Sequence, residues 1–193
     1  MNRIEEVFHN KKAFVAFVTA GDPSIDITEQ LILRMAEAGA DLIEIGIPFS
    51  DPVAEGPIIQ EADYRALEAG ATTDKLFDLV ERIRKVSKVP LAFMTYMNPI
   101  FTYGTDRFMA NCKKVGIDAV IVPDVPFEEK DELKPFCDQY GITLISMIAP
   151  TSKERIKMIA NEAEGFLYCV SSMGVTGVRS EIKTDVGEMI HLV

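Results

Sequence analysis

Glu44 is the residue in this sequence whose surroundings best suit proton-transfer chemistry. It lies in the strand-like run DLIEIGIP (41–48), where Ile43, Ile45 and Ile47 occupy alternate positions. Successive side chains of a strand point to opposite faces, so the isoleucines face covering helices and Glu44 faces the other way. An ionised carboxylate among apolar side chains is costly, so its pKa should rise toward neutrality, where it can act as a general acid or base. The alternative is a buried glutamate paired with Lys or Arg, but no basic residue lies within any strand-like run of the chain.

A long connection follows this strand and carries two further acids, Asp51 and Glu55, together with Pro48, Pro52 and Pro57. The prolines limit the flexibility of the connection. One interpretation is a solvated acidic loop. The other is that a second carboxylate folds over Glu44 to complete a catalytic pair.

Three other places carry weaker signals. Asp124, in the run 119–126, is either a functional acid or a turn former before Pro126. Tyr168 shares a strand face with Phe166, which suits a flat apolar ligand or simple core filling. Thr176 and Gly177 belong to a glycine- and hydroxyl-rich loop that could form a lid or a phosphate-binding nest.

The elements that must position these residues alternate regularly between strands and helices. Six strand-like runs are present, at 13–21, 41–48, 90–99, 119–126, 142–150 and 165–172. Amphipathic helices are predicted between them; Asp26 and Glu29 form a possible capping box for the first, and Gly39 ends it. This order predicts a parallel sheet with right-handed crossovers.

We predict a (β/α)8 TIM barrel rather than an open doubly wound sheet. No GxGxxG motif follows the first strand, and the polar residues come from several strands rather than from one switch point. Such a barrel has eight strands in about 250 residues, so we expect residues 1–193 to form one barrel domain that lacks its last two βα units. A chain that ended there would have exposed strand edges, and we expect it to be poorly stable and nearly inactive.

Composition narrows the function class. The net charge of −10 argues against a general nucleic-acid binder, and no apolar run reaches the length of a membrane span. Three cysteines without CxxC spacing, and only two histidines, argue against a metal site. Cys112 and Cys137 fall on apolar helix stripes, which predicts core packing. A charged start without a signal peptide predicts a cytoplasmic protein.

Several motifs together resemble one enzyme family. FVTAGDPS, IEIGIPFSDPVAEGPIIQ, MTYMNPIFTYG, VPDVPFEE and GVTG occur in the order and spacing of tryptophan synthase alpha subunits. The resemblance covers essentially the whole chain. It implies retro-aldol cleavage of indole-3-glycerol phosphate to indole and glyceraldehyde 3-phosphate, with no metal or organic cofactor in this subunit.

The resemblance also implies roles for individual residues. Glu44 matches the catalytic glutamate that moves protons at the indole C3 and the glycerol hydroxyl. Glu55 stands where the family usually has an aspartate that accepts the indole N–H; the extra methylene moves the carboxylate by about one bond length, and a shift of about 1 Å can cost roughly 100-fold in rate. The residues that match the substrate pocket and its closing loop are Phe17, Met94, Tyr96, Met147, Tyr168, Thr176 and Gly177.

The implied partner is the beta subunit, which holds pyridoxal phosphate and receives indole in an αββα heterotetramer. Pro48, Asp51 and Pro52 match the docking surface of the family. An alternative is a barrel that docks on the beta subunit and activates it without catalysis. Another is a different phosphosugar isomerase or aldolase, although no strand-like run carries a lysine for a Schiff base.

Overall fold

The computed structural model describes residues 3–9, 11–150, 153–171, 174–177 and 186–193. Parallel strands dominate it, in two hydrogen-bonded groups. The first has the order β1-β2-β3-β4-β5, and the second pairs β6 with β7. The bounds are β1 (Val15–Thr19), β2 (Leu42–Gly46), β3 (Leu91–Met94), β4 (Ala119–Ile121), β5 (Thr143–Leu144), β6 (Ser146–Ile148) and β7 (Leu167–Cys169).

All six predicted strand runs therefore contain strands, and the fifth run is divided between β5 and β6. The backbone N–H of Ile145, at the division, still donates to the Val120 carbonyl at 3.0 Å. Strand order equals chain order, and every pairing is parallel. These features define an α/β fold with the strand arrangement of a partial (β/α)8 barrel.

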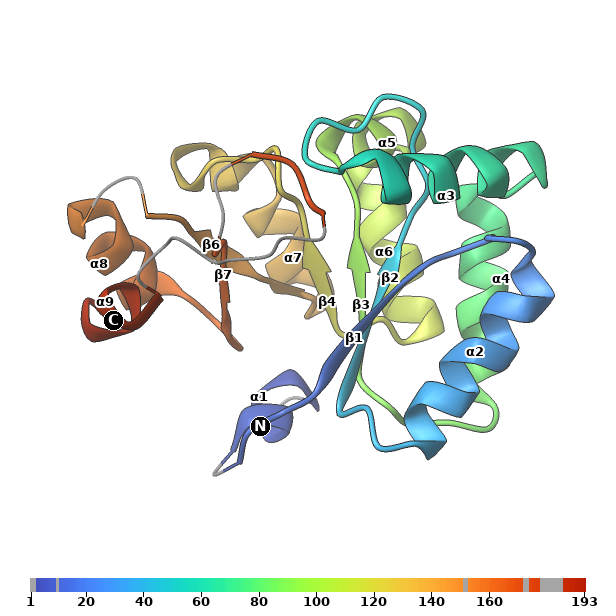
Figure 1. The fold of residues 1–193 in the computed structure, drawn as a ribbon, viewed down its shortest axis with the longest axis horizontal. Helices are drawn as coiled ribbons and strands as arrows, with labels where there is room; N and C mark the ends of the chain where they lie inside the picture. Colours follow the sequence, from blue (N-terminus) through green and yellow to red (C-terminus); the bar gives the residue numbers. More distant parts are fainter. Residues whose placement is uncertain (1–2, 10, 151–152, 172–173, 178–185) are drawn as a thin grey trace.

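Helices follow the strands as the alternating pattern predicts, and α2, α4 and α6 lie along one side of the first sheet (Figure 1). Their bounds are α1 (Arg3–Phe8), α2 (Ile25–Glu37), α3 (Pro57–Glu68), α4 (Thr73–Arg84), α5 (Met97–Tyr103), α6 (Thr105–Val115), η1 (Phe127–Glu132), α7 (Lys134–Tyr140), α8 (Lys153–Glu162) and α9 (Val186–His191). The sequence pattern did not predict α3, which begins within the long connection after β2.

The two faces of the strands bury two separate cores. An outer core between strands and helices contains Ile43, Ile45 and Ile47, as the alternation in β2 predicts. A lumen core on the opposite face contains Leu42 and Ala92, with Phe166 and Tyr168 packed against it. The lumen core places the neighbours of Glu44 on the inside of the barrel.

Helix ends confirm one local prediction and correct another. Gly39 has φ +101° just after α2, where a left-handed residue ends a helix. The helix begins, however, at Ser24, whose side chain accepts the Ile27 N–H at 3.3 Å. Glu29 does not cap the helix; it pairs with Arg82 at 2.6 Å. The Asp26/Glu29 capping box was therefore wrong.

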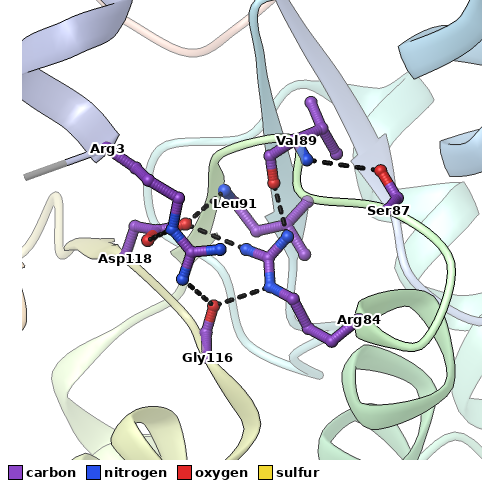
Figure 2. Close-up of polar contacts among 7 residues, drawn as sticks. All are labelled: Arg3, Arg84, Ser87, Val89, Leu91, Gly116 and Asp118. Atoms are coloured by element: carbon purple, nitrogen blue, oxygen red, sulfur yellow. Dashed lines mark hydrogen bonds and ion pairs between the residues drawn. The ribbon is translucent and has the colours of Figure 1, made fainter.

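A charged cluster ties α1 to the N-terminal ends of the strands (Figure 2). Asp118 accepts from Arg3 Nε at 2.7 Å, from Arg84 Nη2 at 2.9 Å and from the Leu91 N–H at 2.9 Å. The Gly116 carbonyl accepts from both arginines, at 3.4 and 2.9 Å. The N-terminal face of a barrel serves stability, so this cluster is structural.

Candidate active site

Glu44 lies in β2 with 5% of its surface exposed. The register places it between Phe17 of β1 and Ala92 of β3. Burial raises the pKa of its carboxyl to about 7. Both expectations for this residue, a place inside the barrel and a pKa near neutrality, are confirmed. A carboxyl that gains and loses its proton near pH 7 is suited to general acid–base chemistry.

A cavity of about 370 Å³ opens in front of Glu44. Phe17, Phe166 and Tyr168 contribute aromatic rings to its wall. Burial, and then the negative charge of Glu44, raise the pKa of the Tyr168 phenol. An acid among aromatic rings fits a flat, apolar substrate that carries an exchangeable proton.

A second cavity of about 410 Å³ lies beside the first and holds the other predicted acid, Glu55. Met94, Met147, Thr176 and Gly177 also line it. Tyr168 and Cys169 line both cavities. Glu44 and Glu55 thus line two adjacent cavities rather than one shared cavity, and Tyr168 forms part of the wall between them.

The carboxyl of Glu55 is only partly satisfied. Its Oε2 atom is buried without a hydrogen-bond partner. Burial raises the pKa of this carboxyl, and the negative charge of Asp124 raises it further, against the backbone N–H groups of Glu55 and Ala54. An unpartnered buried acceptor beside a cavity can receive a donor such as a ring N–H.

The loop 174–177 closes over the connection that carries Glu55. The Thr176 N–H donates to the Ala54 carbonyl at 2.9 Å, and the Thr176 hydroxyl donates to the same oxygen at 3.3 Å. A methyl group built on Gly56 would lie 1.8 Å from the Thr176 carbonyl oxygen. Glycine at position 56 is therefore what allows this close approach.

Tyr96 also contacts the connection between β2 and α3. It is 4% exposed, its hydroxyl accepts the Ala54 N–H at 3.0 Å, and its ring packs on Phe49 at 5.6 Å. Within the described part of the chain, Tyr96 is not among the residues lining the two cavities. Its position shows a residue that holds the loop, whereas its place in the substrate pocket stays a prediction.

The residues predicted for a partner surface lie at the start of this connection. Pro48 is buried, Pro52 is half-buried and Asp51 is exposed, where it accepts a hydrogen bond from the Ser50 hydroxyl at 2.5 Å. Val53, next to them, is 71% exposed. The exposed part of the loop is available for contact.

Asp124 has a structural contact that decides between its two interpretations. Both carboxylate oxygens accept the Met97 N–H, at 3.0 and 3.1 Å, at the first residue of α5. A carboxylate at a helix N-terminus is favourable. Asp124 therefore anchors α5 and acts on the site through its charge near Glu55.

Asp63 is a buried acid near the site that the sequence pattern did not single out. It lies in α3 with 6% of its surface exposed. Burial, and next the charge of Glu55, raise its pKa to about 7. Gly56 followed by Pro57 is a helix-start signal that would have predicted α3, and with it an acid beside Ala62 and Ala66 on the buried face.

The described residues contain no group of three or more His, Cys, Asp or Glu side chains that could hold a metal ion. None of their helices has the length and apolar character needed to cross a membrane. Cys112 and Cys137 are fully buried in the outer core, as predicted.

Fold and site together define the class of (β/α)-barrel enzymes, here with a buried carboxyl of raised pKa in the lumen. The family model of the tryptophan synthase alpha chain matches residues 5–193. A tryptophan synthase alpha chain from Caldanaerobacter subterraneus subsp. tengcongensis is 48% identical over 198 residues, covering 100% of this chain and 76% of the relative. The chain therefore belongs to the tryptophan synthase alpha chain family and has the lyase function of that subunit.

Solved structures agree with this assignment. Tryptophan synthase subunit alpha from Legionella pneumophila is 39% identical with a TM-score of 0.83, over 88% of this chain and 68% of that chain. A structure of the α2β2 tryptophan synthase complex from Pyrococcus furiosus is 38% identical with a TM-score of 0.77, over 81% of this chain and 67% of that chain.

Proposed function

We propose that this chain cleaves indole-3-glycerol phosphate to indole and glyceraldehyde 3-phosphate, with Glu44 as the acid–base residue. The observation that carries the proposal is the position of Glu44: a carboxyl with a pKa of about 7, buried in the lumen beside Phe17 and Tyr168. Family membership supplies the reaction, and the site supplies groups of the right kind.

The carboxyls of Glu44 and Glu55 account for the proton movements of the proposed cleavage. Protonation at C3 of the indole ring makes the ring nitrogen acidic and prepares the bond from C3 to the glycerol chain for cleavage. Glu44 delivers that proton and takes one from the glycerol hydroxyl next to the breaking bond. The electron pair of the breaking bond returns to the ring, and the hydroxyl carbon becomes the aldehyde. Transfer of a proton by a positioned side chain contributes about 10²–10⁴-fold to such a step.

Glu55 is proposed to accept the indole N–H. Its unpartnered, half-buried carboxyl oxygen suits this role. An ionised acceptor stabilises the positive charge that develops on the ring nitrogen. Met94 and Met147 offer apolar surface for the ring, and Thr176 and Gly177 close the phosphate side of the cavity.

The proposed partner is a tryptophan synthase beta subunit, in which pyridoxal phosphate resides, and the proposed location is the cytoplasm. The α2β2 complex of the Pyrococcus furiosus relative supports a partner of this kind. The loop with Pro48, Asp51 and Pro52 is the proposed contact, because its outer residues are exposed.

The test is an assay of indole release from indole-3-glycerol phosphate, with and without a beta subunit, for the chain and for Glu44→Gln. We expect the chain to release indole and Glu44→Gln to lose at least about 100-fold of that rate. Equal rates of indole release for both proteins would show that Glu44 is not the acid–base residue.

A second candidate is a barrel that activates a beta subunit without cleaving substrate itself. Glu55 in place of the usual aspartate, and the separation of the two acids into adjacent cavities, favour it. Stimulation of the beta reaction by both the chain and Glu44→Gln, with no indole release from either, would support this candidate.

A further inference from the structure

Phe8 lines the Glu44 cavity from α1, and no step of the proposed reaction uses it. The same cavity is lined by Glu44 and Tyr168. The Phe8 ring packs on the ring of Phe166, with the two centroids 4.8 Å apart and the ring planes at 34°. Aromatic rings at this separation attract each other beyond their shared burial. Phe8 is therefore part of the cavity wall, although it comes from the N-terminal helix rather than from a strand.

Phe8 closes the cavity at the end of the barrel where the strands begin. Val15, which also lines the cavity, pairs in register with Leu42, and two residues further along the same strands Phe17 pairs with Glu44. Side chains two residues apart on a strand share a face, so Val15 and Leu42 fill the lumen on the N-terminal side of Glu44. Figure 1 shows α1 at that end of the strands, and the Phe8 side chain packs against the lumen core. The Phe8 ring is thus the floor of the cavity, meaning its wall at the N-terminal end of the strands.

Apolar contacts fix α1 in this place. Ile4 and Val7 are 0% and 5% exposed and belong to the lumen core. The chain directly before Phe166 comes close to the helix at Gly165, where an added methyl group would lie 2.7 Å from the Ile4 Cγ2 atom. The helix is therefore held against the segment that carries Phe166, and the Phe8 ring has a defined position.

The proton affinity of Glu44 depends on how well water is kept out of this cavity. Burial is the cause that raises the pKa of Glu44 to about 7. Among the described residues that line the cavity there is no cation, and the other ionisable ones, Tyr168 and Cys169, have pKa values raised by burial and stay neutral near pH 7. The register neighbours of Glu44, Phe17 and Ala92, are apolar. Desolvation, rather than a charged neighbour, therefore favours the protonated carboxyl.

We propose that Phe8 is a positioning residue whose ring forms the floor of the Glu44 cavity and keeps water away from the Glu44 carboxyl. The inference deepens the proposed function and rests on the acid–base role proposed for Glu44. Removal of the ring opens the cavity at the N-terminal end of the strands. Water then solvates the carboxylate, and the proton leaves at a lower pH.

The exclusion of water is tested first without any catalysis. Carbon-13 labelling of glutamate side chains allows the Glu44 carboxyl to be titrated by NMR in the complete chain, with Glu44→Gln used to assign the signal. We expect a midpoint near pH 7 in the parent chain and a fall of at least about half a pH unit in Phe8→Ala. Phe14→Ala, the same change on a ring that is 65% exposed, should leave the midpoint unchanged. A midpoint in Phe8→Ala equal to that of the parent chain, or an ordinary glutamate value in both, would overturn the proposal.

A second measurement keeps the proposal testable if Phe8→Ala fails to fold. 4-Fluorophenylalanine is placed at position 8 of the parent chain and of Glu44→Gln, and its fluorine-19 signal is followed with pH. We expect the signal to shift with a midpoint near pH 7 in the first protein and to lose that shift in the second. His9 is present in both proteins, so it does not account for a difference between them. The same response in both proteins, or no response in either, would overturn the proposal.

The catalytic readout is the pH profile of kcat/KM for indole release with a beta subunit present. In Phe8→Ala, the limb that reflects ionisation of Glu44 should move to lower pH by the amount found in the NMR titration. Phe8→Leu, which keeps most of the apolar bulk, should restore most of the parent profile. A profile that keeps its position in Phe8→Ala with a uniformly lower rate would show a merely structural residue and contradict the proposal. If no protein released indole, the proposed reaction would fail, and the NMR titration would still decide whether Phe8 keeps water from Glu44.

Discussion

Glu44 and Tyr168 face one cavity from β2 and β7, and the charge of the first raises the pKa of the second. The phenol therefore keeps its proton throughout the range in which Glu44 titrates. Tyr168 can donate a hydrogen bond to Glu44 or to a substrate, but it does not act as a base near neutral pH. Under the proposed reaction the two residues would therefore differ in role: Glu44 would transfer protons, and Tyr168 would provide an aromatic ring and a hydrogen-bond donor.

This division predicts a contrast between two substitutions. Tyr168→Phe keeps the ring and loses one neutral hydrogen-bond group, so the rate of indole release should fall by less than about tenfold. Glu44→Gln keeps the shape and loses the proton carrier, so the rate should fall by about 100-fold or more. Rates measured side by side in the same buffer check this, and a larger loss for Tyr168→Phe than for Glu44→Gln would reverse the assignment.

The raised pKa of Glu44 predicts a pH dependence of stability. Folding raises this carboxyl's pKa from 4.5 to about 7, so the folded state binds more protons than the unfolded state between these values. The unfolding free energy should be highest below pH 4.5 as far as Glu44 is concerned, and should fall as pH rises to about 7, by at most on the order of 3 kcal/mol.

Urea unfolding at several pH values between 5 and 8 measures this effect. Glu44→Gln should show a shallower decline than the parent chain, because its amide does not ionise. Some decline should persist, since Asp63 titrates in the same window. Identical slopes for the two proteins would mean that Glu44 is solvated in the folded state.

The local sequence pattern was enough to predict that the Glu44 side chain faces the inside of the barrel. Strand alternation is a property of neighbouring residues, and three isoleucines on alternate positions of β2 leave only one side for the acid. The six strand runs and the burial of Cys112 follow from the same kind of pattern. Nothing in them depends on where distant parts of the chain meet.

The features that were wrong or absent in the sequence prediction depend on distant contacts. Ser24 and Asp26 are both good capping residues two positions apart, so the local pattern did not distinguish them, and the structure has Ser24 as the cap. Asp63 was not singled out because its burial depends on how α3 packs, and burial is the main cause of its raised pKa. The hydrogen bond that the Tyr96 hydroxyl accepts from the Ala54 N–H is likewise specified by no local pattern, and the place of Tyr96 in the substrate pocket stays a prediction.

Gly56→Ala should disturb the closure of the loop 174–177 without disturbing the fold. The backbone of Gly56, with φ −85° and ψ 176°, is allowed for alanine, so the new methyl group adds no backbone strain. It would clash with the Thr176 carbonyl and push the loop 174–177 away from Ala54. We expect indole release to fall by about tenfold or more while the thermal midpoint changes little, because residues 174–177 are exposed. Faster proteolysis in that loop would accompany the change, and an unaltered rate would show that closure is not required.

Asp118→Asn should destabilise the chain without touching the site. The substitution leaves Arg84, whose side chain is 13% exposed, and Arg3 without their common anion. Loss of one partner from a buried pair costs about 3 kcal/mol. Chemical unfolding measures the loss, and Glu37→Gln, which breaks the exposed pair with Arg34, is the matched control that should stay near the parent value. Equal stability of the two variants would mean that the cluster in Figure 2 is solvated and weak.

Glu55→Asp tests whether the length of this side chain limits the proposed reaction. Glutamate places its carboxyl about one bond length farther from the backbone than aspartate would, and here one of its oxygens is buried without a partner. An acceptor displaced by about 1 Å meets the indole N–H poorly and can cost on the order of 100-fold in rate. We therefore expect Glu55→Asp to raise kcat for indole release, by up to about that factor, and Glu55→Gln to lower it, because the amide lacks the charge that stabilises the ring nitrogen.

Measuring kcat and KM for all three proteins with a beta subunit present separates positioning, which changes kcat, from simple binding, which changes KM. A rate for Glu55→Asp equal to or below that of the parent chain would show that the connection between β2 and α3 has already adjusted to the longer side chain.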